Sequence, residues 1–393
     1  MRNKIENFIR IPLLLLLSSM LFVQCDKSDP VVATESLDDM LAKSTDLSMF
    51  KSAVAKARLE TFTKGPGPFT IFAPTDAAFT AAGITSATIA AMDSITLTAL
   101  VLNHFQTSGL GVLKGRTSFE IPEGPNAPMA SIAGYSNYSY KDKAADKIYV
   151  NGALVTERDI KCSNGIIHKI NKLLFPPVLP VMTLLAANPN YSLMVQAINK
   201  TGLQSSTFAP AASSPITVFA LSNAVMTANG YDATTIAALV AATPAYITLS
   251  NILKYNVAAS RNFSTDMKAG ALRTAYVIGA STNTFVTVSF GPGLMIKGIS
   301  NPTPFQVTGL DIAASNGVIQ EIAGMLKPYL LFNTKYNFII GQCALAEIMC
   351  HGFERKLLVN TGWPIYKVQS VLVVSCSVLS QINAPIKYNN IYL

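Results

Sequence analysis

Reactive and charged side chains are scarce in this chain of 393 residues. Histidine occurs three times and tryptophan once, and charged residues make up 13% of the sequence. No HExxH, CxxC or GxSxG motif and no phosphate-binding glycine loop is present. These absences argue against zinc-dependent or serine-type hydrolysis and against nucleotide chemistry. We therefore expect a protein that is not an enzyme and that carries no metal or other cofactor.

Cysteine does not supply a disulfide framework. Of the five cysteines, Cys162 alone lies between residues 31 and 328, and Cys343, Cys350 and Cys376 lie near the C-terminus. An unpaired cysteine in the central part of the chain predicts that its fold is held by packing and hydrogen bonds, without disulfides.

Basic residues are not clustered. The formal net charge is +8, but it is spread along the chain without a dense run of lysine and arginine. This pattern argues against nucleic acid as a partner. The length and the hydrophobic fraction of 50% instead indicate two or three folded domains.

The N-terminus has the pattern of a secretory signal. Arg2, Lys4 and Arg10 precede an apolar run over residues 11–23 that is too short to span a membrane. Cys25 follows this run and resembles the cysteine of bacterial lipoproteins, which becomes the lipidated N-terminus. We expect residues 1–24 to be a signal peptide and the protein to be lipid-anchored to the outer membrane of the cell envelope. The alternative is an ordinary signal peptide and a secreted protein.

A strand followed directly by a helix start occurs twice. Residues 69–73 are apolar and partly β-branched, Pro74 ends the predicted strand, and Thr75 is placed to cap a helix that begins with Asp76. Residues 216–225 repeat this order, with Ser222 as the cap and Asn223 after it. The chain therefore contains an internal repeat with a period of about 150 residues.

Tight turns close each repeat. Asn164-Gly165 precedes an apolar strand over residues 166–170, and Asn316-Gly317 precedes the same pattern, with Gln320 in the place of His168. A further hairpin is predicted at Asn151-Gly152. We place the two domains at residues 31–178 and 179–328.

Helical spacing of apolar residues recurs ahead of each strand. Residues 37–59 predict one or two helices with a break near residues 44–46, and further helices are predicted over 86–92 and 94–105. The apolar positions of the first repeat have counterparts in the second: Leu41 and Leu185, Leu47 and Tyr191, Phe50 and Met194, Leu59 and Leu203. These pairs are the expected core.

His104 ends one of the predicted helices, and the corresponding residue in the second repeat is Asn256. An asparagine at the equivalent position is expected of a structural hydrogen-bonding residue and not of an acid–base catalyst. Tyr255 precedes that asparagine.

The two pairs of motifs resemble the fasciclin domain. Its first block resembles residues 70–79 and its second resembles residues 151–170. The resemblance implies an α+β fold in which each domain is a β-sandwich-like wedge flanked by helices, and a role in adhesion or in contact with matrix or polysaccharide. A Tyr-His pair linked to receptor binding in some members is split here, which leaves His104 and Tyr255 as candidate binding residues.

We expect a surface adhesion protein that contacts a protein or polysaccharide at the cell surface. The alternative is a glycan-binding component of a bacterial surface polysaccharide system. For that role, Tyr135, Tyr138 and Tyr140 are the best candidates, because their spacing predicts that all three share one strand face.

The last segment, residues 329–393, has no fasciclin motif and stays unassigned. It is either a small added module or a non-native reading of the end of the gene. Its three cysteines and His351 match no known metal-site spacing.

Overall fold

The computed structural model describes residues 33–107, 115–209, 214–279 and 281–328. These residues belong to one compact unit that ends at Pro328, and a second unit comprises Tyr329–Leu393. Cys25, the signal segment and residues 329–393 lie outside the described residues. The predictions made for them therefore stay predictions.

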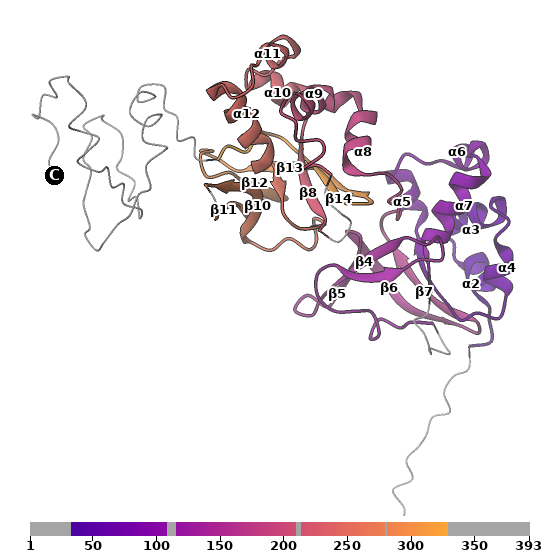
Figure 1. Cartoon of the computed structure of the whole chain (residues 1–393). Coiled ribbons are helices and arrows are strands. Elements are labelled where there is room, and N and C mark those ends of the chain that lie inside the picture. The colour runs from indigo at the N-terminus through magenta and orange to yellow at the C-terminus, as the bar shows by residue number, and fades with distance from the viewer. Residues whose placement is uncertain (1–32, 108–114, 210–213, 280, 329–393) are drawn as a thin grey trace, which may run out of the picture. The chain divides into compact units, whose positions relative to one another are not determined.

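The first repeat combines short helices with a seven-stranded sheet (Figure 1). Its helices are α2 (Leu37–Lys43), α3 (Ser48–Lys56), α4 (Glu60–Lys64), α5 (Asp76–Ala81), α6 (Ser86–Ala91) and α7 (Ser94–Asn103). Its strands are β1 (Phe69–Pro74), β2 (Phe105–Thr107), β3 (Ala127–Ala130), β4 (Ser136–Asp142), β5 (Lys147–Val150), β6 (Ala153–Cys162) and β7 (Gly165–Ile170).

The second repeat follows the same order. Its helices are α8 (Val181–Ala187), the 3-10 turn η2 (Pro189–Tyr191), α9 (Ser192–Lys200), α10 (Asn223–Ala228), α11 (Ala233–Ala238) and α12 (Pro244–Tyr255). Its strands are β8 (Ile216–Leu221), β9 (Val257–Ala258), β10 (Gly270–Ile278), β11 (Thr282–Phe290), β12 (Leu294–Lys297), β13 (Phe305–Ala314) and β14 (Gly317–Ile322). The predicted α+β fold class is thus confirmed, and the domain bounds at 31–178 and 179–328 stay a prediction.

The sheets share one topology, and in the first an isolated bridge between Gln106 and Ser131 joins β2 to the residue that follows β3. The first runs β2-β1-β7-β6-β5-β4-β3, and the second runs β9-β8-β14-β13-β12-β11-β10 and closes into a barrel. In each, the strand before the cap pairs in parallel with the last strand, β1 with β7 and β8 with β14. A pairing of Thr274 with Ala258 closes the second sheet. The sequence patterns did not predict this closure, because it depends on one long-range strand contact.

The strand-and-cap motif is confirmed in both repeats. The Thr75 hydroxyl accepts the Ala78 N–H at 3.3 Å, and the Ser222 hydroxyl accepts the Val225 N–H at the same distance. β1 ends at Pro74, and every residue of β8 is buried. Since a capping side chain satisfies one of the free N–H groups of a helix, the chain can turn from a buried strand into a helix within one residue.

The polar residues of the motifs hold helices to the sheet. The Asn164 side chain accepts the N–H of Leu37 at the start of α2, and Asn316 accepts that of Val181 at the start of α8. The next residues after the caps do the same for α3 and α9: Asp76 accepts the Met49 N–H, and Asn223 accepts the Leu193 N–H. The predicted core pairs of the two repeats are all buried.

One prediction about strand orientation is wrong. Tyr138 and Tyr140 alternate with buried Asn137 and Ser139 on β4, but Tyr135 precedes the strand, which starts at Ser136. A separation of three residues also reverses the side of a pleated strand. Only Tyr138 and Tyr140 therefore share a face, and Tyr149 of β5 pairs with Tyr140 on it.

Candidate functional site at the junction of the two repeats

In the first repeat, His168 of β7 fastens a loop to the sheet. Its Nδ1 accepts the Asp159 N–H at 3.2 Å, and its Nε2–H donates to the Arg116 carbonyl at 2.9 Å. Asp159 accepts the backbone N–H and the hydroxyl of Ser118 at 2.6 and 2.5 Å. We call this set of contacts the latch. It ties the segment before β3 to β6 and β7.

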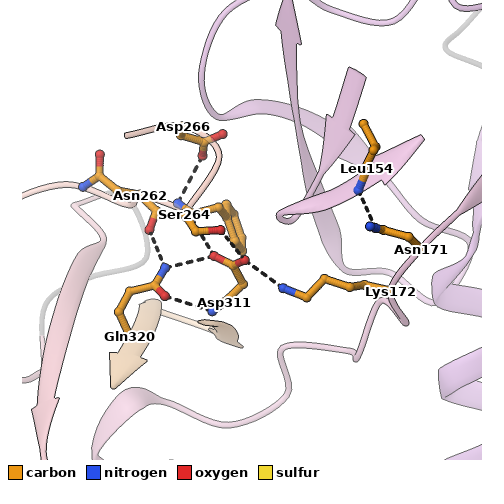
Figure 2. Close-up of polar contacts among 9 residues, drawn as sticks. Leu154, Asn171, Lys172, Asn262, Ser264, Asp266, Asp311 and Gln320 are labelled. Atoms are coloured by element: carbon orange, nitrogen blue, oxygen red, sulfur yellow. Dashed lines mark hydrogen bonds and ion pairs between the residues drawn. The ribbon is translucent and has the colours of Figure 1, made fainter. Parts of the chain in front are cut away.

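The second repeat builds the same latch with an amide (Figure 2). Gln320 Oε1 accepts the Asp311 N–H at 3.0 Å, and its Nε2 donates to the Asn262 carbonyl at 3.2 Å. Asp311 accepts the N–H and the hydroxyl of Ser264 at 2.6 and 2.7 Å. Both aspartates adopt a positive φ, at 63° and 67°. His168 in the first repeat and Gln320 in the second therefore have the same structural role.

Asp311 has a further partner, which comes from the first repeat. Lys172 Nζ lies 2.9 Å from Asp311 Oδ2, as Figure 2 shows. The aspartate side chain is 1% exposed and the lysine 37% exposed. A carboxylate so deeply buried is costly without a partner, and Lys172 supplies the cation that pairs with it. Loss of the lysine would leave that charge with hydrogen bonds alone.

The hairpin turn at Gly152 lies against the same carboxylate. A Cβ on Gly152 would lie 2.3 Å from Asp311 Oδ2, and the residue has φ +77°. Any side chain here would clash with Asp311 and strain the backbone. Glycine is thus required both by the turn and by the close approach of the second repeat.

An arginine completes the contact between the repeats. The guanidinium of Arg261 lies 4.0 Å from the centroid of the Tyr138 ring, and its carbonyl accepts the Asn126 side-chain N–H at 2.7 Å. Tyr138 also packs on Phe263, with ring centroids 6.4 Å apart. Arg261 is 4% exposed. Stacking on an aromatic face suits a guanidinium that has lost its water. We call these residues, with Gly152, Lys172 and Asp311, the junction.

A buried acid lies beside the junction. The pKa of Asp266 is raised to about 7. Burial is the largest cause and the charge of Asp311 adds to it, while the hydrogen bond from the Phe263 N–H opposes the shift. The Asp266 charge in turn contributes to a raised pKa of Tyr140 in the first repeat, where burial is the larger cause. The negative charge on Asp266 is therefore unfavourable where the repeats meet.

His104 lies in the core and not at a surface. Its Nδ1–H donates to the Leu100 carbonyl at 2.8 Å, and its Nε2 accepts the Leu174 N–H at 3.0 Å. Burial lowers the pKa of His104 to about 4. Asn256 makes the equivalent bonds, donating to Ile252 and accepting from the Leu326 N–H. The predicted structural role of this position is confirmed.

Tyr255 is also fully buried. Its hydroxyl donates to the Phe285 carbonyl at 2.6 Å and accepts the Ile299 N–H at 3.0 Å. It therefore holds β11 to the segment that follows β12. Neither His104 nor Tyr255 reaches the surface, and the binding role predicted for them stays a prediction.

The tyrosines on the first sheet have different surroundings. Tyr138 is covered by Arg261, whereas the rings of Tyr140 and Tyr149 lie side by side, with centroids 6.1 Å apart and an angle of 12° between their planes. Tyr135 is part-buried and lies before the strand. Tyr140 and Tyr149 thus form a pair of parallel rings, and Tyr149 was not among the predicted residues.

The described residues contain no group of three histidine, cysteine, aspartate or glutamate side chains that could hold a metal ion. In the same residues, no helix has the length and apolar content needed to cross a bilayer. Sequence reasoning missed Lys172, Arg261, Ser264 and Asp311. The matching positions of Asp159 and Asp311, each before an Asn-Gly turn, were the available signal.

A family model described as "Fasciclin domain" matches residues 45–176 and 189–328. The chain is 31% identical over 144 residues to Protein sll1483 of Synechocystis sp., covering 36% of this chain and 73% of that protein. It is 30% identical over 149 residues to human periostin, covering 38% of this chain and 17% of periostin. The pig protein named transforming growth factor-beta-induced protein ig-h3 is 25% identical over 183 residues, with 45% and 25% covered.

A solved structure described as a FAS1 domain pair from the insect cell adhesion molecule Fasciclin I is also similar. It is 17% identical, with a TM-score of 0.34, and the match covers 74% of this chain and 98% of that one.

Proposed function

The chain belongs to the fasciclin domain family, and from that premise we propose that it is a non-enzymatic adhesion protein, lipid-anchored through Cys25 at the outer membrane. Fasciclin domains are associated with cell adhesion and interaction. Its partner is a protein or polysaccharide at the cell surface. The chain spans only 17% of periostin and 25% of ig-h3, so the activities of those whole proteins are not assigned to it.

The non-enzymatic part of this proposal rests on the hydrogen bonds that both repeats make at two equivalent positions. The ring nitrogens of His104 and His168 are all engaged by backbone groups, and Asn256 and Gln320 make the same bonds in the second repeat. Side chains that hold loops and strands in place are not free to transfer protons to a substrate. Each repeat is built to present a stable surface.

The junction supports presentation of two such surfaces together. Lys172 with Asp311, and Tyr138 with Arg261, join the repeats through a buried ion pair and a stacked guanidinium. When two weak sites are held in one body, the second contact forms at a high effective concentration. Adhesion through two modules therefore gains strength without a tight individual site.

Bead capture tests the adhesion proposal. Beads coated with the full chain should bind cells of the host more strongly than albumin-coated beads at the same density, and a Lys172→Glu coat should bind less. The variant places a second negative charge beside Asp311 and disturbs the junction. Equal capture by coated and albumin beads contradicts the adhesion role.

The anchor has its own test. The intact mass of protein recovered from host membranes should equal the chain from Cys25 onward plus acyl groups, and a Cys25→Ser variant should be lost from the membrane fraction. An unacylated wild-type chain would show that the protein is secreted.

The Tyr140–Tyr149 pair favours polysaccharide as a second candidate. The two parallel rings on one sheet face offer aromatic surface against which a sugar ring can pack. Replacement of both by serine should abolish retention of the chain on immobilised host polysaccharide, while Tyr135→Ser leaves it unchanged. Retention of the double variant would exclude this surface.

A further inference from the structure

The two repeats present one equivalent sheet face in different surroundings. In the first repeat, Tyr140 pairs across β4 and β5 with Tyr149, and in the second, Thr287 pairs across β11 and β12 with Lys297. On the first face, the neighbouring Tyr138 is covered by Arg261 of the second repeat. Because the repeats share a topology, β11 and β12 of the second repeat correspond to β4 and β5 of the first.

The second face exposes large apolar side chains. Phe285 is 47% exposed and Phe290 57% exposed on β11, and Ile299 beyond β12 is 52% exposed. Val286 and Val288 alternate with Phe285 and point into the core, whereas Phe290 pairs with the buried Leu294 and so lies on the same side of β11 as the two valines. The Tyr255 hydroxyl binds backbone atoms of both Phe285 and Ile299, which places these two residues side by side. Figure 1 shows β10, β11 and β12 as neighbours.

The same strands lack negative charge. No aspartate or glutamate occurs between Asp266 and Asp311, whereas Lys268, Arg273 and Lys297 do. Arg273 pairs with Phe285 across β10 and β11, so a cation adjoins the exposed ring. Neither Arg273 nor Lys297 takes part in the ion pairs found among the described residues. We call Arg273, Phe285, Lys297 and Ile299 the β10–β12 face.

We propose that the β10–β12 face docks on an anionic lipid surface. Lysine and arginine near such a surface are each attracted to acidic headgroups, and phenylalanine and isoleucine gain by entering the boundary between headgroup and hydrocarbon. A face with cations and apolar side chains but no acid matches both layers of that boundary. This docking goes beyond the adhesion role, which does not depend on it.

Two other occupants fit the face less well. The segment after Pro328 contains five lysine and arginine residues against two glutamates, so its charge has the same sign as the face. A soluble acidic polysaccharide would satisfy the cations but would give Phe285 and Ile299 no apolar phase to enter.

Vesicle sedimentation tests the proposal with the full chain carrying Cys25→Ser, which cannot be acylated. Binding to vesicles of three parts phosphatidylcholine to one part phosphatidylglycerol should exceed binding to pure phosphatidylcholine. The double variant Arg273→Glu/Lys297→Glu should lose this preference, with the partition coefficient reduced about tenfold or more. The control pair Lys147→Glu/Lys161→Glu in the first repeat changes the net charge equally and should retain it.

Variants of the apolar side chains separate lipid from other partners. The double variant Phe285→Ser/Ile299→Ser, which removes the aromatic ring and the aliphatic side chain of the face, should reduce binding to the acidic vesicles, whereas Phe119→Ser, at an 87%-exposed ring in the first repeat, should not. All variants share the same N-terminus, so its contribution cancels. Equal binding to both vesicle types, or unaltered binding of the apolar double variant, would overturn the proposal. Retention on soluble alginate that survives the apolar double variant would assign the face to a polyanion, and concentration-dependent self-association would assign it to a second copy.

Discussion

The two repeats hold the same loops in place with different side chains. His104 and His168 in the first occupy the positions of Asn256 and Gln320 in the second, and each pair bonds to the equivalent backbone groups. What the fold requires at these positions is one donor and one acceptor at a fixed spacing. An imidazole and an amide both meet this requirement. They differ in that only the imidazole can take up a proton near neutral pH.

The aspartates of the two latches differ in a second way. Asp159 and Asp311 both accept two bonds from a serine, but only Asp311 also meets a cation from the other repeat. The same local motif has thus become part of the junction in one copy alone. Substitutions of Asp311 and of Asp159 test this difference.

The largest effect is expected from Asp311→Asn. Asparagine tolerates the positive φ and can keep the oxygen that accepts from Gln320, but Lys172 loses its anion and meets the amide NH2 in place of Oδ2. We expect a loss of about 3 kcal/mol in the free energy of unfolding of the second repeat. Asp159→Asn, which breaks no ion pair, should cost about 1 kcal/mol. Urea unfolding measures both, and equal costs would show that Lys172 contributes nothing.

Acidification should act on the two repeats with opposite sign. The pKa of His104 is lowered by burial to about 4, so the stability it contributes is complete above its usual value of 6.5 and falls as the pH drops towards 4. The shift corresponds to at most roughly 3 kcal/mol in the first repeat. The pKa of His168 is lowered in the same direction.

The second repeat should gain stability over the same interval. The pKa of Asp266 is raised to about 7, so the folded state takes up a proton below pH 7 that the unfolded state does not bind until about its usual value of 3.8. Hydrogen exchange at pH 7 and pH 5, corrected for intrinsic rates, reports each repeat separately. A parallel fall in both would contradict the assignment, and His104→Asn should remove much of the loss in the first.

A reciprocal exchange comes next in size. His104→Asn should keep both hydrogen bonds and cost about 1 kcal/mol for the volume lost, since asparagine already serves there in the second repeat. Asn256→His adds volume to a packed site and should cost more, about 2 kcal/mol. His104→Leu is the control, because it fills the site but leaves the Leu174 N–H unpaired. If His104→Leu proves harmless, the hydrogen bonds do not matter.

The smallest effect is expected at the end of the strand. Leu221 stands in the second repeat where Pro74 stands in the first, and both strands end there with a capped helix following. Pro74→Leu should therefore change the thermal midpoint of the first repeat by an amount that corresponds to about 0.5 kcal/mol. The cap variant Thr75→Ala should cost about 1 kcal/mol. A larger loss for Pro74→Leu than for Thr75→Ala would show that proline itself ends the strand.

Much of the fold could be predicted because its signals are local. The caps at Thr75 and Ser222 and the turns at Asn164 and Asn316 are read from a few adjacent residues, whose conformational preferences hold wherever the segment lies. The internal repeat then tested each local prediction twice. The presence of His104 in one repeat and Asn256 at the equivalent position of the other already indicates a structural role in the sequence.

The candidate site could not be found in this way. Lys172 and Asp311 are separated by most of the second repeat, and neither lies in a pattern that names the other. The prediction that three tyrosines share one face is wrong for Tyr135, because it lies three residues from Tyr138 and precedes β4. Tyr149 joined Tyr140 only through the register of the hairpin.

The sequence by itself determined the repeats, their helices and turns, and the family to which they belong, since these follow from short-range preferences and apolar spacing. The tertiary structure alone decided that one pair of distant residues joins the ends of each sheet, that Asp311 meets a lysine and Asp159 does not, and that Arg261 covers Tyr138 while the β10–β12 face stays exposed. These features depend on which distant surfaces come together. Burial and strand register fix those contacts, and neither is encoded in any single segment.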